Sequence, residues 1–137
     1  MKFSFEWLQE FVEIPCSAEV LAEKLTLSGF ECEGIETIAS DVKGVVTGKI
    51  ESISPHPDAD KLVVTQVMIG SETVQIVTGA KNIFEGAIVP VSLPGAVLSG
   101  GLKIKVSKLR GVESYGMLCS EVELGVSDES KGIWILP

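Results

Sequence analysis

Apolar residues recur at helical spacing in two short stretches near the N-terminus. Residues 4–13 predict a first helix with Ser4 as its N-cap, and residues 17–28 predict a second helix capped by Ser17. An alternating pattern over residues 30–38 then predicts a strand. The apolar positions of each predicted helix share one face: Trp7, Leu8, Phe11 and Val12 in the first, and Ala18, Leu21, Ala22 and Leu25 in the second.

After Lys43 the pattern changes to short alternating segments that are separated by glycine and proline. Five β-strands are predicted, together with a connector at 80–86 that forms a link or one helical turn. Five short strands with a connector between the third and the fourth favour a five-stranded OB-fold β-barrel, and a plain β-sandwich is the alternative. The sequence therefore predicts an α+β chain with two domains, 1–40 and 41–137. The five predicted strands are 45–53, 62–70, 73–79, 87–93 and 102–111.

The composition of the chain indicates a folded protein without a membrane-spanning segment. The chain has 137 residues, of which 45% are hydrophobic, so it can bury a real core. No apolar run approaches the roughly 18 residues that span a bilayer. Glu6, Glu10 and Glu13 interrupt the apolar residues at the N-terminus, which excludes a signal peptide. We therefore expect a cytoplasmic protein without a membrane segment.

The three cysteines do not form a recognisable metal or disulfide pattern. Cys16, Cys32 and Cys119 lie far apart, and the chain has one histidine. A structural zinc site takes four Cys or His ligands in paired spacings, so no metal site is expected. The simplest interpretation is three reduced and mostly buried thiols.

The charge is unevenly distributed along the chain. The formal net charge is −8, yet residues 41–110 carry eight bases and six acids. Salt screens distant charges beyond about 8 Å at physiological ionic strength, so a local basic stripe on an acidic protein can still meet phosphate. The alternative is a solvated strand face, and charge alone does not separate the two. Four of the bases lie close together: Lys103, Lys105, Lys108 and Arg110.

Strand parity places only part of this basic stripe on one face. Lys103 and Lys105 alternate with apolar residues and so share the outer face of the predicted strand. Lys108 and Arg110 have the opposite parity and join that face only if the strand bulges near Ser107.

The stretch "SPHPDADKL", residues 54–62, contains the single histidine. Its prolines restrict the backbone on both sides of His56, and the carboxylates of Asp58 and Asp60 suit the backbone hydrogen bonds that hold a tight turn. A metal site would have three ligands on one loop, and a catalytic site would lack a nucleophile motif. A stiff corner between two strands is the favoured interpretation.

Together, "HPDADKL" and "KLRGVESYGMLCS" resemble the tRNA-binding, EMAP-II-like OB domain of several aminoacyl-tRNA synthetases and their helper proteins. "MKFSFEWLQEFVEIP", "VTGAKNIFEG" and "ELGVSDESKGIWILP" are similar to the start of the bacterial phenylalanyl-tRNA synthetase beta-chain family. The resemblance covers the whole chain and identifies it as an N-terminal fragment. On this basis, residues 1–40 need beta-chain residues beyond Pro137 to complete their core.

The resemblance implies a function and a set of partners. The family enzyme joins phenylalanine to its tRNA with ATP and magnesium as an α2β2 assembly, and its catalytic site lies in the alpha chain. This fragment is thus expected to hold no catalytic, cofactor or metal site and to bind tRNA, the alpha chain and the rest of the beta chain. A packing module that binds no RNA is the alternative. The residues that the resemblance places at the tRNA face are Lys103, Lys105, Lys108, Arg110, Ser114 and Asn82.

Overall fold

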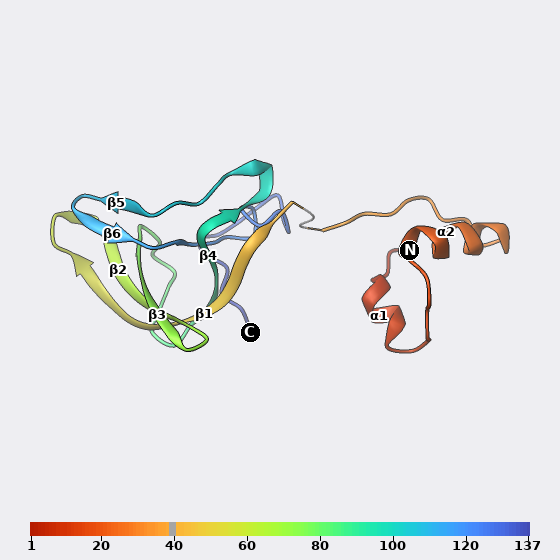
Figure 1. Ribbon diagram of the computed structural model, residues 1–137, viewed down its shortest axis with the longest axis horizontal. Helices are drawn as coiled ribbons and strands as arrows, with labels where there is room; N and C mark the ends of the chain where they lie inside the picture. Colours follow the sequence, from red (N-terminus) through yellow and green to blue (C-terminus); the bar gives the residue numbers. More distant parts are fainter. Residues whose placement is uncertain (39–40) are drawn as a thin grey trace. The chain divides into compact units, whose positions relative to one another are not determined.

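The computed structural model describes residues 1–38 and 41–137, and these form two compact units, 1–37 and 38–137 (Figure 1). The predicted domain boundary after residue 40 adjoins residues 39 and 40, which lie outside the described residues.

The first unit contains two short helices, α1 (Phe5–Gln9) and α2 (Ala18–Leu27). The Ser4 hydroxyl accepts a hydrogen bond from the Trp7 N–H at 3.3 Å, and the Ser17 hydroxyl accepts one from the Val20 N–H at 3.5 Å. Both helices and both N-caps are therefore confirmed, although α1 is shorter than predicted. Among the described residues, no helix is long and apolar enough to cross a bilayer.

The apolar face of this unit is largely uncovered. Neither helix has a buried residue. The rings of Trp7 and Phe11 pack edge to face at 5.3 Å, yet their side chains are 55% and 68% exposed. The strand predicted for 30–38 is wrong, because these residues adopt no regular structure. A strand needs a neighbour for its backbone groups, and within residues 1–37 none is present.

The second unit is built on a five-stranded antiparallel sheet in the order β3-β2-β1-β4-β7. The four strands predicted at 45–53, 62–70, 73–79 and 87–93 are confirmed. The first two extend further than predicted, so that a turn of only Pro57 and Asp58 joins them. The strands of this sheet are β1 (Lys43–His56), β2 (Ala59–Ile69), β3 (Glu72–Thr78), β4 (Ile88–Val97) and β7 (Met117–Leu118).

The strand predicted at 102–111 is wrong, because this segment does not form one continuous strand. Lys103 forms a single bridge with Val97, and residues 104–106 are irregular. A separate two-stranded hairpin follows, made of β5 (Ser107–Leu109) and β6 (Val112–Ser114). The expected alternation fails as well, since Leu102 and Val106 are 53% and 50% exposed. The fifth strand of the sheet is instead β7.

The hairpin turn explains why the segment breaks. Arg110 and Gly111 link β5 to β6 with φ angles of +48° and +89°. Two consecutive residues with positive φ match a type I′ turn, which reverses the chain tightly. Residues 107–109 therefore pair with residues that follow them in the chain rather than with the edge of the main sheet.

Two groups of buried side chains hold the second unit together. One group lies among β1, β2, β3, β4 and β7. The other is formed by residues from the end of β4, from the chain that follows β4 and from the chain that follows β7. The C-terminal segment closes over them, because the Trp134 N–H donates to the Cys119 carbonyl and the Leu136 N–H donates to the Ile88 carbonyl. The buried members are Ile50, Val67, Ile76, Ala87, Val89, Val91 and Leu118 in the first group and Ala96, Leu98, Ile104, Cys119 and Leu124 in the second.

The three cysteines are free thiols in different environments. Cys119 is buried, Cys16 is half-buried and Cys32 is exposed. The expectation of mostly buried thiols is therefore wrong for Cys32, which follows α2 in the uncovered first unit. Burial raises the pKa of the Cys119 thiol, so less of it is in the reactive thiolate form at a given pH.

At pH 8 we expect iodoacetamide to modify Cys32 readily and Cys119 about 100-fold more slowly, because Cys119 reacts only when the second unit opens. Peptide mass spectrometry after timed quenching measures both rates. In concentrated urea the two rates should converge. Rapid modification of Cys119 in the folded protein would contradict its burial.

Candidate nucleic-acid interface

The four basic residues expected at the tRNA face are all exposed. Lys103 lies at the bridge to β4, Lys105 follows it, and Lys108 lies in β5 directly opposite Glu113 of β6. Arg110 occupies the tip of the hairpin, in its turn. The hairpin and the chain leading into it thus present four cations within eight residues.

Hydrogen bonds fix the base of this hairpin to the edge of β3. The Tyr115 N–H donates to the Gln75 carbonyl at 2.9 Å, and the Gln75 side chain donates to the Glu113 carbonyl at 2.8 Å. Residues 113–115 therefore line the outer edge of β3, while β7, just after them, pairs with β4 at the other end of the sheet. Figure 1 shows β5 and β6 running together with their tip beside the turn between β1 and β2.

Ser114 is part of this seam. Its side chain is 1% exposed, and its hydroxyl accepts from the Val77 N–H and donates to the Gly116 carbonyl, both at 3.0 Å. The hydroxyl therefore supplies a hydrogen-bond acceptor to a backbone N–H of β3 that has no partner strand on that side. The sequence between Gly111 and Gly116 suggested a turn at Ser114, and this is wrong, because Ser114 is the last residue of β6. Its burial follows only from the fold.

Replacing Ser114 with Ala is expected to lower the free energy of unfolding by about 1–3 kcal/mol, because the buried Val77 N–H loses its acceptor. Urea denaturation followed by fluorescence measures the change. Ser107→Ala is the matched control, since Ser107 is exposed at the start of β5. If Ser114→Ala were as stable as the control, the Val77 bond would not contribute to stability.

Asn82 holds the C-terminal segment. Its amide nitrogen donates to the Ile133 carbonyl at 2.7 Å, and its amide oxygen accepts from the Ile133 N–H at 3.1 Å. Gly132 permits this approach, because a Cβ there would lie 2.4 Å from the amide oxygen of Asn82. The side chain is exposed and keeps one donor and one acceptor position beyond these bonds.

His56 is confirmed as a corner residue between two strands, and the structure gives its ring two partners. The ring is 5% exposed; Nδ1 accepts from the Asp58 N–H at 3.0 Å, and Nε2 lies 2.8 Å from the Leu109 carbonyl oxygen. Since Nδ1 accepts, Nε2 carries the proton and donates to Leu109. The ring thus makes the turn bond that the sequence analysis assigned to the aspartates.

The aromatic side chains near the hairpin are few. Tyr115 is 40% exposed, and its hydroxyl donates to the Glu113 carboxylate at 2.5 Å. This hydrogen bond and the charge of Glu113 raise the pKa of Tyr115 above its usual value, so the phenol stays neutral. Phe84, in the connector before β4, is 56% exposed. Base stacking therefore has little aromatic surface here, and cationic contact with phosphates is the chemistry that the hairpin favours.

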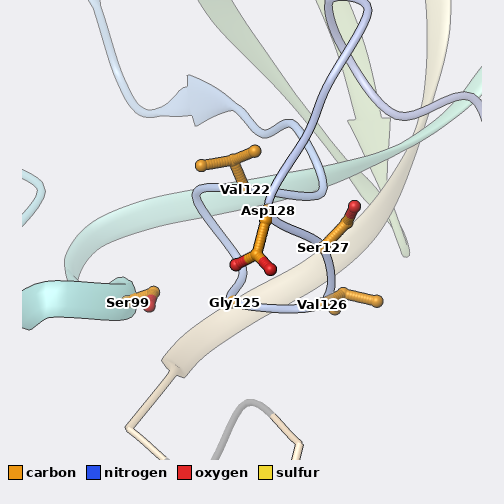
Figure 2. A pocket seen from close by; sticks show the side chains of 6 residues that line it. All are labelled: Ser99, Val122, Gly125, Val126, Ser127 and Asp128. Atoms are coloured by element: carbon orange, nitrogen blue, oxygen red, sulfur yellow. The ribbon is translucent and has the colours of Figure 1, made fainter.

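A shallow hollow elsewhere in the second unit has a different character. It is lined by apolar and small polar residues and by one carboxylate, that of Asp128, which points into the hollow in Figure 2. The hollow is poorly suited to bind phosphate, because its lining contains a negative carboxylate and no basic side chain. Across the described residues, no three His, Cys, Asp or Glu side chains gather to hold a metal ion. The lining residues are Ser99, Val122, Gly125, Val126, Ser127 and Asp128.

Comparison with known proteins shows which protein family this chain is similar to. Residues 45–137 match the family described as "Putative tRNA binding domain". The whole chain is 53% identical to a phenylalanine–tRNA ligase beta subunit from Clostridium tetani and 51% identical to one from Francisella tularensis, each over 139 residues. In both cases the chain spans 18% of the relative's length.

A solved structure, that of the C-terminal domain of Plasmodium vivax p43, is 26% identical, with a TM-score of 0.45. The match covers 61% of this chain and 48% of that one.

Proposed function

The chain belongs to the tRNA-binding domain family, and on that premise we propose that it is the tRNA-binding module of a phenylalanine–tRNA ligase beta chain. The observation that carries the proposal is the family match over 45–137, which includes the whole exposed basic hairpin. In the proposal, residues 41–137 form the binding domain, and residues 1–40 form an element completed by the rest of a longer beta chain. The uncovered Trp7 and Phe11 support the second part.

The proposed fold of the binding domain is a five-stranded OB barrel. Its support is the seam at residues 113–115, which joins the β3 edge to the chain leading into β7. In a closed barrel no sheet edge is left free. The chain between β4 and β7, which carries the four basic residues, then lies on one side of the barrel.

In the proposed interface, Lys103, Lys105, Lys108 and Arg110 contact RNA phosphates. Ser114 and Asn82 border the same face, where their internal bonds hold the backbone that carries it. The remaining donor and acceptor of Asn82 are available to RNA. Phosphate contacts carry no sequence information, so this module adds affinity, and selection of the correct tRNA belongs to other parts of the enzyme.

The activity of the longer protein is also part of the proposal. It is the ligation of phenylalanine to its tRNA in the cytoplasm, with ATP and magnesium, by an assembly with the alpha chain. The residues described in this chain do not fit a magnesium site, since they include no cluster of acidic, His or Cys ligands. The proposal therefore assigns binding to this chain and the reaction to other parts of the enzyme.

A salt titration of tRNA binding tests the proposal. Fluorescence anisotropy with labelled tRNA, from about 50 to 200 mM salt, should give a log–log slope of about −3 to −4, because each phosphate contact contributes about −0.7 to −0.9. We expect affinity in the micromolar range for the chain alone, because the acidic residues 1–40 and 111–137 oppose binding. No binding at the lowest salt would instead support the packing module.

A further inference from the structure

We infer that His56 is a positioning residue that holds the tip of the β5–β6 hairpin, and with it Arg110, in place for contact with RNA. This inference rests on the proposed function. It concerns a residue that the interface itself does not contain, since the ring is buried and reaches Arg110 only through the neighbouring backbone.

The hairpin needs such support because its own interactions are few. β5 has three residues, all exposed, and within residues 41–137 β5 and β6 form a sheet of only two strands. A two-stranded hairpin is marginally stable in water. The bonds of residues 113–115 to β3 hold the middle and the base of the hairpin, beyond the pair Leu109 and Val112 that closes the turn at Arg110 and Gly111.

The His56 ring makes a bond at that free end. Nε2 lies 2.8 Å from the carbonyl oxygen of Leu109, the residue that directly precedes Arg110. The peptide group that this bond fixes is the one through which Arg110 enters the turn. Arg110 itself has a φ of +48°, which is uncommon for a residue with a side chain and persists where the surroundings impose it.

The ring is itself held firmly. It is 5% exposed, and its Nδ1 accepts from the Asp58 N–H at 3.0 Å within the turn between β1 and β2. Pro55 and Pro57 restrict the backbone on either side. His56 therefore joins a corner of the main sheet to the tip of the basic hairpin, two points 53 residues apart in the sequence.

Ordering the tip before RNA arrives should strengthen binding, because a mobile Arg110 would lose conformational freedom on contact. Without the Leu109 bond, the hairpin would remain attached at its base, and the contact at Arg110 would weaken most. The expected consequence is loss of one phosphate contact rather than loss of the whole interface.

Two substitutions separate the two ring bonds. In His56→Gln the amide N–H can take the place of Nε2 and donate to Leu109, while in His56→Asn the amide oxygen can take the place of Nδ1 and accept from Asp58. We expect the Gln variant to bind tRNA within about threefold of wild type. The Asn variant should bind about tenfold more weakly, with its salt slope reduced by about one unit, as expected for one lost phosphate contact.

Arg110→Ala supplies the comparison. Alone it should reproduce the Asn variant, and combined with His56→Asn it should add little, since both remove the same contact. All measurements are made under conditions in which circular dichroism shows each variant to be folded. Equal affinity of the Asn and Gln variants, whether high or low, would overturn the inference.

A second measurement needs no variant and no RNA. In the folded wild type, ¹⁵N spectra of the His56 ring should show a protonated Nε2 and an unprotonated Nδ1. The opposite tautomer would overturn the inference, because Nε2 would then have no proton to give Leu109. If the wild type bound no tRNA yet showed the expected tautomer, the proposed function would fail while the anchoring of the hairpin stood.

Discussion

Replacing both Lys103 and Lys105 with Glu is expected to weaken the binding of every tRNA by about a hundredfold or more. This corresponds to a loss of about 1.4 kcal/mol of binding free energy for each tenfold change in affinity. Each substitution removes a phosphate contact and adds a negative charge beside the remaining bases. The salt slope should fall by about two units. Different tRNAs should be affected equally, because phosphate contacts carry no sequence information.

Lys24→Glu with Lys131→Glu is the matched control, since it changes the net charge equally at two exposed residues outside the segment 103–110. It should leave the salt slope near that of wild type. Asn82→Ala is expected to cost binding less, about 1 kcal/mol, as a single hydrogen-bonding group. Ser114→Ala should weaken binding only through the backbone that its buried hydroxyl holds. If the two double variants bound tRNA with the same affinity and slope, Lys103 and Lys105 would not contact RNA phosphates.

Placing Val at Gly48 is expected to destabilise the second unit by about 3 kcal/mol, at the upper end for overpacking of a core. A Cβ at this position in β1 would lie 2.6 Å from Cγ1 of Val67 and 2.9 Å from Cγ2 of Val91. Both valines are fully buried, so neither side chain can move aside without disturbing β2 or β4. Urea denaturation monitored by circular dichroism measures the loss.

Gly34→Val is the control for this experiment. A Cβ at Gly34 would meet nothing within 4 Å, so we expect a change within about 0.5 kcal/mol. Should Gly48→Val unfold at the same urea concentration as wild type, β1, β2 and β4 would not pack as closely as the structure shows.

The amino-acid sequence by itself determined the features that depend on neighbours in the chain. Ser4 and Ser17 cap their helices with bonds to residues three positions away. The four strands from β1 to β4 follow from alternation between turns. His56 at a corner follows from its prolines. Strand parity also placed Lys103 and Lys105 at the surface, where the structure has them, whereas it left the position of Lys108 and Arg110 open.

The tertiary structure decided what depends on partners far along the chain. Alternation over 102–111 fits a strand, yet the turn at Arg110 and Gly111 sends that segment into a hairpin, and the strand at 30–38 has no neighbour to pair with. The buried Ser114 hydroxyl accepts from the N–H of Val77, 37 residues away, and the His56 ring bonds to the carbonyl of Leu109, 53 residues away. A hydrogen bond between distant residues forms only where the fold brings them together, so no local pattern in the sequence encodes these contacts.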